Sequence, residues 1–184
     1  MQEFGLRLAV AYFISLAGAF GTYFWARSQE PKSKPKDPQA IAVLTSTKNE
    51  VLRKPFQHLV WKSINNTERI FSGESVRTGS NAEAQIEFLE NGTTVQLDPD
   101  SVILIETAGA SINLDFLKGN LFIKTSNAQG ITLQSGTQRL ALNKSEVSVS
   151  KTQGAKQLDL NVFKGEVSDI TSGKAKPVEA PRLR

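Results

Sequence analysis

Residues 73–101 read GESVRTGSNAEAQIEFLENGTTVQLDPDS, and this stretch decides the fold. Apolar and polar residues alternate through Ala84–Phe88 and again through Thr93–Leu97. Because successive side chains of a β-strand point to opposite faces, the alternation predicts two strands, each with one buried and one solvent-facing side. Asn91-Gly92 lies between the two runs, and both residues tolerate the positive φ angles of a type I′ turn. The stretch therefore predicts a β-hairpin.

The same period of two continues over the rest of residues 41–170, without any sustained helical periodicity. Glycine-containing turn signals separate the runs, and among them we interpret Lys118-Gly119 and Lys164-Gly165 as hairpin turns. We therefore predict an all-β domain of many short antiparallel strands, either a sandwich or a solenoid-like body. The apolar positions that repeat at this spacing are Ile112, Leu114, Phe116, Leu121, Ile123, Ile131, Leu133, Leu140, Leu142, Val147, Val149, Leu158, Leu160 and Val162.

The charge of the chain is concentrated outside the predicted β domain. The 184 residues include 22 basic and 18 acidic side chains, for a formal net charge of +4. Residues 41–170 hold almost equal numbers of the two, which argues against a basic face, so we expect no nucleic-acid partner. Cysteine is absent, and His58 is the single histidine. This composition excludes disulfides, thiolate metal sites and a cysteine nucleophile, and it removes most zinc sites.

The remaining residues form no arrangement typical of catalysis. His58 lies in Phe56–Trp61, an apolar run that we interpret as strand-like, and we expect it to be a structural or surface histidine. Asp98–Asp100 reads as a turn and does not match a calcium loop. Glu83 and Glu87 share the solvent-facing side of a strand, whereas catalytic carboxylates need burial to separate their pKa values. We expect no catalytic, metal or cofactor site, with a carboxylate- or Lys-based enzyme as the remote alternative.

An uncharged apolar segment, Leu8–Ala26, follows a short N-terminal tail of residues 1–7. As a helix it would be about 28 Å long, close to the thickness of the hydrocarbon core of a bilayer. Tyr23 and Trp25 lie at its far end, where aromatic rings favour the lipid headgroups. A cleaved signal peptide is the alternative, since Ala17–Ala19 resembles a cleavage site. The apolar run continues beyond that point, which favours an uncleaved transmembrane anchor.

Two polar segments flank the predicted domain. Residues 27–40 (RSQEPKSKPKDPQA) contain three prolines and no large apolar side chain, so they cannot bury enough surface to become ordered. Residues 171–184 have the same character. We therefore predict a tail (1–7), a transmembrane helix (8–26), a flexible linker (27–40), a β domain (41–170) and a disordered basic tail (171–184).

The stretch quoted above resembles the signature of the FecR-protein domain, which has a Gly-Asp-x-Val-x-Thr-Gly turn, a Gly-containing hairpin and then Pro-x-Ser. Downstream, Leu114–Gly119 resembles the second turn of the family and Leu160–Val167 its closing element, so the resemblance covers residues 50–170. Glu74 replaces the usual Asp and Asn91 an acidic residue, and both keep the turn chemistry. The signature positions, which we expect to have structural roles, are Gly73, Val76, Arg77, Thr78, Gly79, Gly92, Pro99, Ser101, Gly119 and Gly165.

The resemblance implies a domain on the envelope side of a bacterial inner membrane. In the sensor-regulators of the family, such a domain links a cytoplasmic anti-sigma segment to an outer-membrane transporter. Residues 1–7 are too few to fold, so we expect a stand-alone, membrane-anchored member that lacks the anti-sigma segment. The basic residues of the linker 27–40 favour a cytoplasmic domain under the positive-inside rule. The resemblance implies the periplasm, and we favour the periplasm.

We therefore expect a single-pass inner-membrane protein whose FecR-like domain is a non-catalytic binding module. Its partner would be an envelope protein or a cell-wall polymer, bound at strand edges, in a groove or on the solvent-facing side of the sheet. The alternative is one component of a FecR-type relay that regulates a sigma factor through a separate chain. The sequence leaves the identity of the partner, the strand topology and the oligomeric state open.

Overall fold

In the computed structural model, the residues that the structure describes are 20, 39–109, 111–126, 130–155, 157–172 and 175–178. The chain divides into two units, residues 1–37 and 38–184, and all described residues except Phe20 belong to the second. The predicted transmembrane helix, most of the predicted linker and most of the predicted basic tail lie outside the described residues. Within the described residues, no helix has the length and apolar character needed to cross a membrane.

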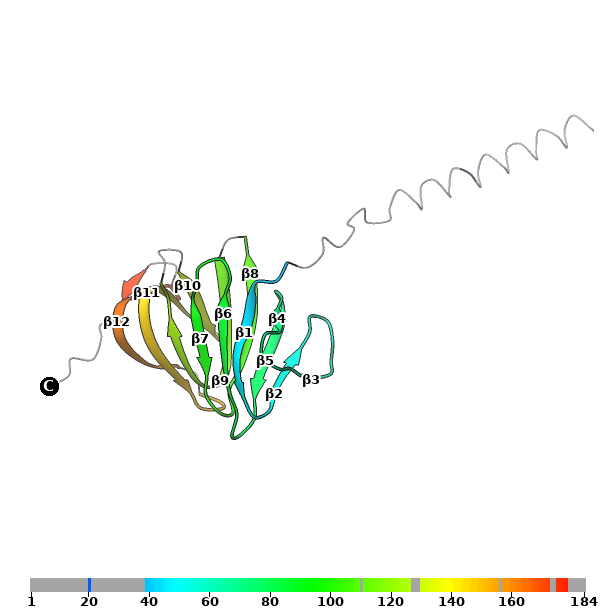
Figure 1. Cartoon of the computed structure of the whole chain (residues 1–184). Coiled ribbons are helices and arrows are strands. Elements are labelled where there is room, and N and C mark those ends of the chain that lie inside the picture. The colour runs from blue at the N-terminus through cyan, green and yellow to red at the C-terminus, as the bar shows by residue number, and fades with distance from the viewer. Residues whose placement is uncertain are drawn as a thin grey trace, which may run out of the picture. The chain divides into compact units, whose positions relative to one another are not determined.

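The described part of the domain is all-β, as predicted, with thirteen strands in one hydrogen-bonded sheet (Figure 1). The strands are β1 (Ala42–Lys48), β2 (Val51–Lys54), β3 (Lys62–Ser63), β4 (Arg69–Ile70), β5 (Glu74–Thr78), β6 (Glu83–Phe88), β7 (Thr94–Leu97), β8 (Val102–Ala108), β9 (Ser111–Lys124), β10 (Ile131–Ser135), β11 (Gln138–Lys151), β12 (Asp159–Asp169) and β13 (Lys176–Pro177).

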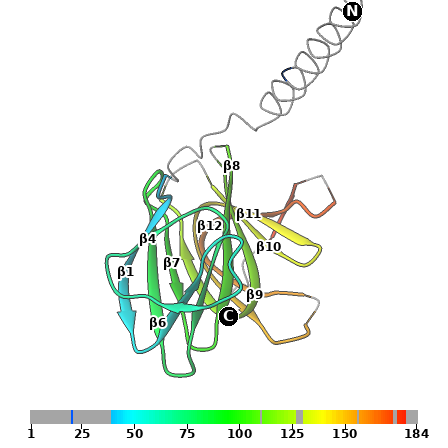
Figure 2. The same ribbon diagram turned by 90° about the vertical axis from the view of Figure 1, so that its right-hand side faces the viewer.

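The sheet folds into two layers because its long strands bend, and two of them, β9 and β11, change partners along their length (Figures 1 and 2). Residues 111–118 of β9 pair with β8 and β10, whereas residues 119–124 pair with β7 and β11. The first layer contains β4, β1, β6, β7 and the second half of β9. The second layer contains β3, β2, β5, β8, the first half of β9 and β10. Strands β11 and β12 also contribute to both layers, so the layers are joined covalently.

Single residues with positive φ angles bend these long strands from one layer to the other. Gly119 (φ 106°) lies within β9, Lys144 (φ 44°) within β11 and Gly165 (φ 84°) within β12. The β11–β12 pairing also shifts register between Asn143 and Glu146, which is a β-bulge. Our prediction of hairpin turns at Lys118-Gly119 and Lys164-Gly165 was therefore wrong. A positive φ at one residue redirects a strand here and does not reverse it.

The strands are not all antiparallel, which corrects the second part of our fold prediction. β9 and β10 run parallel, with Ile131 beside Ile112, so the sheet is mixed. Only residues 125–130 separate the two strands in the sequence. Lys124, at the end of β9, pairs with Glu146 of β11. Ile131, at the start of β10, pairs with Leu142 of β11, and the β-bulge of β11 separates Leu142 from Glu146. The bend of β9 thus brings its end back near its start, and a short connection suffices for a parallel pair.

The predicted hairpin at Asn91-Gly92 forms between β6 and β7, but its turn is longer than a type I′ turn. Of the two residues, Gly92 has a positive φ angle (61°), and Asn91 does not. The Phe88 amide donates to the Thr93 carbonyl at 2.9 Å, and the Thr93 amide donates to the Asn91 side-chain oxygen at 3.0 Å. The side chain of Asn91 thus closes a five-residue loop from within.

The core lies between the two layers. Both layers turn their apolar sides inward, and these side chains form a single cluster that includes the fully buried Phe88 and Phe116. The alternating positions predicted from the sequence are buried in this cluster, except that Leu160 is half-buried at its margin. The period of two therefore identified the inward faces correctly in both layers.

The bend at Gly119 predicts a large loss of stability for Gly119→Ala. A Cβ there would lie 2.7 Å from the Cβ of Ser101, and the backbone would keep its positive φ. Gly136→Ala is the matched control, since its φ is also positive (58°) and its Cβ would meet no atom within 4 Å. We expect a loss of roughly 3 kcal/mol or more at Gly119 and about 1–2 kcal/mol at Gly136. Urea unfolding of the full chain, followed by circular dichroism, measures both, and equal losses would contradict the packing argument.

Candidate binding surface

Several signature residues lie in one buried hydrogen-bond network that joins β5, β8 and β9. The Thr78 hydroxyl donates to the Asp98 carbonyl at 2.7 Å and accepts from the Ser101 amide at 3.0 Å. The Ser101 hydroxyl donates to the Asn120 carbonyl at 2.9 Å and accepts from the Asn120 amide at 3.0 Å. Two hydroxyls thus add to the backbone bonds from Thr78 to Ser101 and from Asp98 to Asn120 at the place where Gly119 bends β9.

The other signature positions also lie in structural surroundings. Val76 is buried in the core, and Arg77 is exposed on the opposite side of β5. The Gly79 carbonyl accepts from the amides of Ala82 and Asp100, each at 3.1 Å. Pro99 lies half-buried in the same turn, and a Cβ at Gly165 would lie 2.7 Å from the backbone of Ser145. None of these places presents a reactive side chain to solvent.

The apolar run Phe56–Trp61 is a loop between β2 and β3, so our interpretation of it as strand-like was wrong. The His58 amide donates to the Pro55 carbonyl at 3.1 Å, and Gln57 has a φ of 61°. The chain therefore turns immediately after β2, because Pro55 cannot donate to a ladder and Gln57 leaves the extended region. His58 is exposed.

This β2–β3 loop (residues 55–61) exposes three large apolar side chains. Phe56 is 62% exposed, Leu59 93% and Val60 67%. The indole of Trp61 is held from one side by Lys54, whose Nζ lies 5.4 Å from the ring centroid. Isolated exposed apolar residues are ordinary, but three within one short loop form a patch that marks a contact surface.

A partly buried ion network lies at the base of the loop. Arg53 of β2 lies 3.4 Å from the Glu68 carboxylate and 3.8 Å from that of Glu74, and it donates to the Arg69 carbonyl at 3.0 Å. Glu74 is almost fully buried and accepts from the Phe71 amide at 3.1 Å. Burial raises the pKa of Glu74, and the Phe71 hydrogen bond and the Arg53 charge only partly oppose this effect.

Three adjoining open hollows form a groove that ends at the β2–β3 loop. The first, about 480 Å³, begins where Ile41 leads into β1. It shares Ser72 and Thr107 with the second, about 310 Å³. The second shares Phe56, Gly73 and Glu106 with the third, about 320 Å³. We call this row of adjoining hollows the groove. A Cβ at Gly73 would lie 2.5 Å from Cδ2 of the Phe56 ring, so the ring occupies this position only because Gly73 has no side chain.

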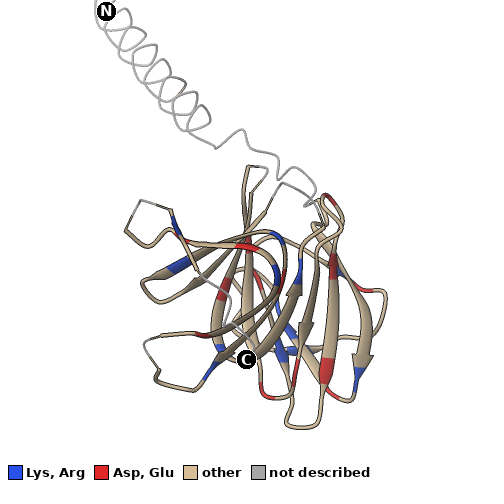
Figure 3. Cartoon of the chain, turned by 90° about the vertical axis from the view of Figure 1, so that its left-hand side faces the viewer, with Lys and Arg blue, Asp and Glu red and all other residues tan. Residues whose placement is uncertain are grey.

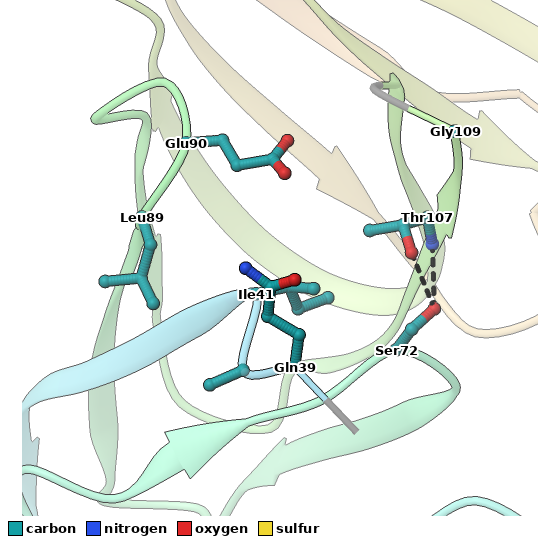
Figure 4. A pocket seen from close by; sticks show the side chains of 8 residues that line it. Gln39, Ile41, Ser72, Leu89, Glu90, Thr107 and Gly109 are labelled. Carbon is teal, nitrogen blue, oxygen red and sulfur yellow. Dashed lines mark hydrogen bonds between the residues drawn. The ribbon is translucent and has the colours of Figure 1, made fainter. Parts of the chain in front are cut away.

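The first hollow has polar groups on two sides (Figure 4). Glu90, from the β6–β7 loop, points across the hollow toward Thr107 of β8, with Gln39 and Ile41 between them. The Ser72 hydroxyl accepts from the Thr107 amide at 2.9 Å and bonds to its hydroxyl at 3.0 Å. The two hydroxyls are bonded to each other, which holds the chain before β5 against β8.

Basic and acidic residues are interspersed along the strands (Figure 3). The groove itself is lined by the carboxylates of Glu90 and Glu106 and, near the loop, by Lys54 and His58. Among the described residues, no group of three or more potential metal ligands occurs. The arrangement provides hydrogen-bonding and apolar contacts along an open path.

Sequence reasoning did not find the groove. Its lining residues Ser72, Thr107, Glu106 and Asn113 come from separate segments, and no local pattern connects them. The loop had one usable signal. Pro55, directly after a strand, indicates a break, and this signal should have outweighed the apolar character of the residues that follow.

The model of the family described as FecR protein matches residues 74–168. The chain belongs to the FecR protein family. A crystal structure of a candidate anti-sigma factor from Parabacteroides distasonis is similar over 58% of this chain and 51% of that one, with 14% identity and a TM-score of 0.49. This chain thus matches about half the length of that protein. No curated protein matches the chain. The β2–β3 loop precedes the range matched by the family.

The raised pKa of Glu74 predicts a pH-dependent difference between the native chain and Glu74→Gln. The pKa of Glu74 in the folded chain lies above the ordinary value of 4.5. At pH values between the unfolded and the folded pKa, the carboxyl therefore takes up a proton on folding. The stability of the native chain relative to the variant should therefore fall as pH rises above 4.5, with a slope of at most about 1.4 kcal/mol per pH unit. Urea unfolding across this range measures it, and a difference that stays constant or increases would refute the assignment.

Proposed function

We propose that this FecR-family domain is a non-catalytic binding module, held on the periplasmic side of a bacterial inner membrane by residues 8–26. Its groove would bind an extended partner, either a protein segment or a cell-wall polymer. The proposal rests on one observation, namely that the three hollows adjoin one another in a row from Ile41 to Phe56. Family membership supports the fold, whereas the function is argued from this surface.

The shape and lining of the groove favour an extended chain over a small enclosed ligand. Small-molecule sites surround most of the surface of their ligand, and the three hollows are open along one side. Thr107, Asn113 and Glu106 offer hydroxyl, amide and carboxylate groups, while Phe56 and Ile41 offer apolar contacts. Alternating polar and apolar contacts of this kind suit a peptide or a polysaccharide.

The side chains of the groove support binding better than catalysis. Nucleophilic catalysis requires a hydroxyl within hydrogen-bond reach of a base that a third group orients. The Ser72 hydroxyl is instead bonded to Thr107, and His58 projects from the loop at the far end of the groove. We therefore infer that a bound partner is held and not transformed.

Family membership also supports a second function, namely one component of a FecR-type relay that regulates a sigma factor through a separate chain. This function requires contact with a cytoplasmic regulator through the N-terminal part of the chain. Copurification of that regulator with the full chain from cells would support it. Normal signalling after deletion of residues 1–7 would count against it.

The groove predicts site-specific crosslinking in intact cells. A photoreactive amino acid at Ala108, which is exposed and lines the second hollow, should yield a discrete adduct with the partner. The control is the same group at Glu87, exposed on β6 in the first layer. Gel mobility and mass spectrometry of the adducts provide the readout.

Equal adducts at both positions, or none at Ala108, would contradict the groove as the binding site. The non-catalytic part of the proposal is tested separately, by incubating the purified full chain with envelope polymers. Release of any cleaved or modified product would overturn it.

A further inference from the structure

The tip of the β2–β3 loop consists of two apolar residues that are largely exposed to solvent. Leu59 is 93% exposed and Val60 67%, and both precede Trp61, which is half-buried at the base of the tip. Backbone turning at Pro55 and Gln57 directs these side chains away from the core. Val60 lines none of the three hollows and Leu59 lines only the third, whereas residues that anchor protein interfaces usually fill packed depressions.

The charged residues of the loop and of the segments directly flanking it are basic. From Val51 to Thr67 the charged side chains are Arg53, Lys54 and Lys62, all basic. Arg53 is engaged by Glu68 and Glu74. The ion pairs within the described part of the chain include neither Lys54 nor Lys62. Two ammonium groups therefore flank the apolar tip, and the carboxylate that faces the loop, Glu106, lies on its groove side.

We propose that the β2–β3 loop inserts its tip into the surface of an anionic lipid bilayer. Leu59 and Val60 would enter the boundary between headgroups and acyl chains, as apolar side chains of interfacial segments do. The Trp61 indole would lie at the headgroup level. Lys54 and Lys62 would lie near lipid phosphates, and the position of Lys54 over Trp61 places one cation beside the indole.

The predicted domain order supports this occupant. If residues 8–26 anchor the chain, the linker of residues 27–40 keeps the domain within roughly 50 Å of the bilayer. The loop would then convert a loose tether into a defined orientation, with the third hollow of the groove beside the membrane surface. The inference stands on the chemistry of the loop and does not depend on what the groove binds.

The experiment uses Trp61 as a fluorescent reporter in the full chain. The chain contains two tryptophans, so Trp25→Phe leaves Trp61 as the only one. The protein is reconstituted into phosphatidylcholine vesicles with or without phosphatidylglycerol, both with brominated acyl chains. We expect Trp61 emission to shift to shorter wavelength and to be quenched in the anionic vesicles. The double variant Lys54→Gln/Lys62→Gln should lower the equilibrium constant for insertion of the loop by roughly tenfold or more. Each lysine near an anionic surface raises such a constant about fivefold.

The decisive variant is Leu59→Ser with Val60→Ser, both at exposed positions, and it should abolish the quenching. Leu117→Ser with Phe163→Ser is the matched control, because these apolar side chains are also exposed but lie outside the loop, and it should leave quenching unchanged. Urea midpoints equal to that of the native chain verify folding.

The result that overturns the proposal is unquenched Trp61 in anionic brominated vesicles, or equal loss in both double variants. If the Leu59/Val60 variant loses a crosslinked protein adduct while Trp61 is unquenched, the loop contacts a protein and the lipid inference fails. If the photoreactive group at Ala108 yields no adduct while Trp61 is quenched in anionic vesicles, the groove is refuted as a binding site and the lipid inference is supported.

Discussion

The structure depends on a backbone constraint at one residue of β9. Gly119 adopts a positive φ of 106° and packs directly against Ser101, so β9 can leave one layer and enter the other. The hydroxyls of Thr78 and Ser101 satisfy the backbone groups that the bend removes from the ladder. Together with the bends at Lys144 and Gly165, this bend lets the apolar sides of the two layers face each other, whereas a flat sheet would leave its apolar side uncovered.

The family signature therefore encodes the bend and its support. Within the buried network, Ser101 donates its amide to the Thr78 hydroxyl and packs against Gly119. Val76 is buried in the core. Residues with such roles are expected to be shared by proteins with different partners, since the fold does not determine what a surface binds. The groove and the β2–β3 loop consist mostly of connecting segments, where binding residues are commonly found. Family membership and function are thus carried by different parts of this molecule.

The exposed loop requires a rigid base, and the Arg53 network provides one. Arg53 joins the carboxylates of Glu68 and Glu74 and the carbonyl of Arg69, which ties β2, β4 and β5 together below the loop. The raised pKa of Glu74 reflects the cost of burying that carboxylate. The network therefore stabilises the strands from which the apolar loop extends.

The sequence by itself determined the all-β class, the inward-facing residues and the family, because a period of two reports directly which side chains share a face. Three features were decided only by the tertiary structure. The glycines at 119 and 165 bend strands where we predicted turns, since a positive φ serves either purpose. β10 pairs in parallel with β9, which the sequence did not predict. The alternation identifies which side chains share a face and carries no information about which strands are neighbours. Phe56–Trp61 is a loop, since an apolar run is a strand only where the fold offers it a ladder and a core.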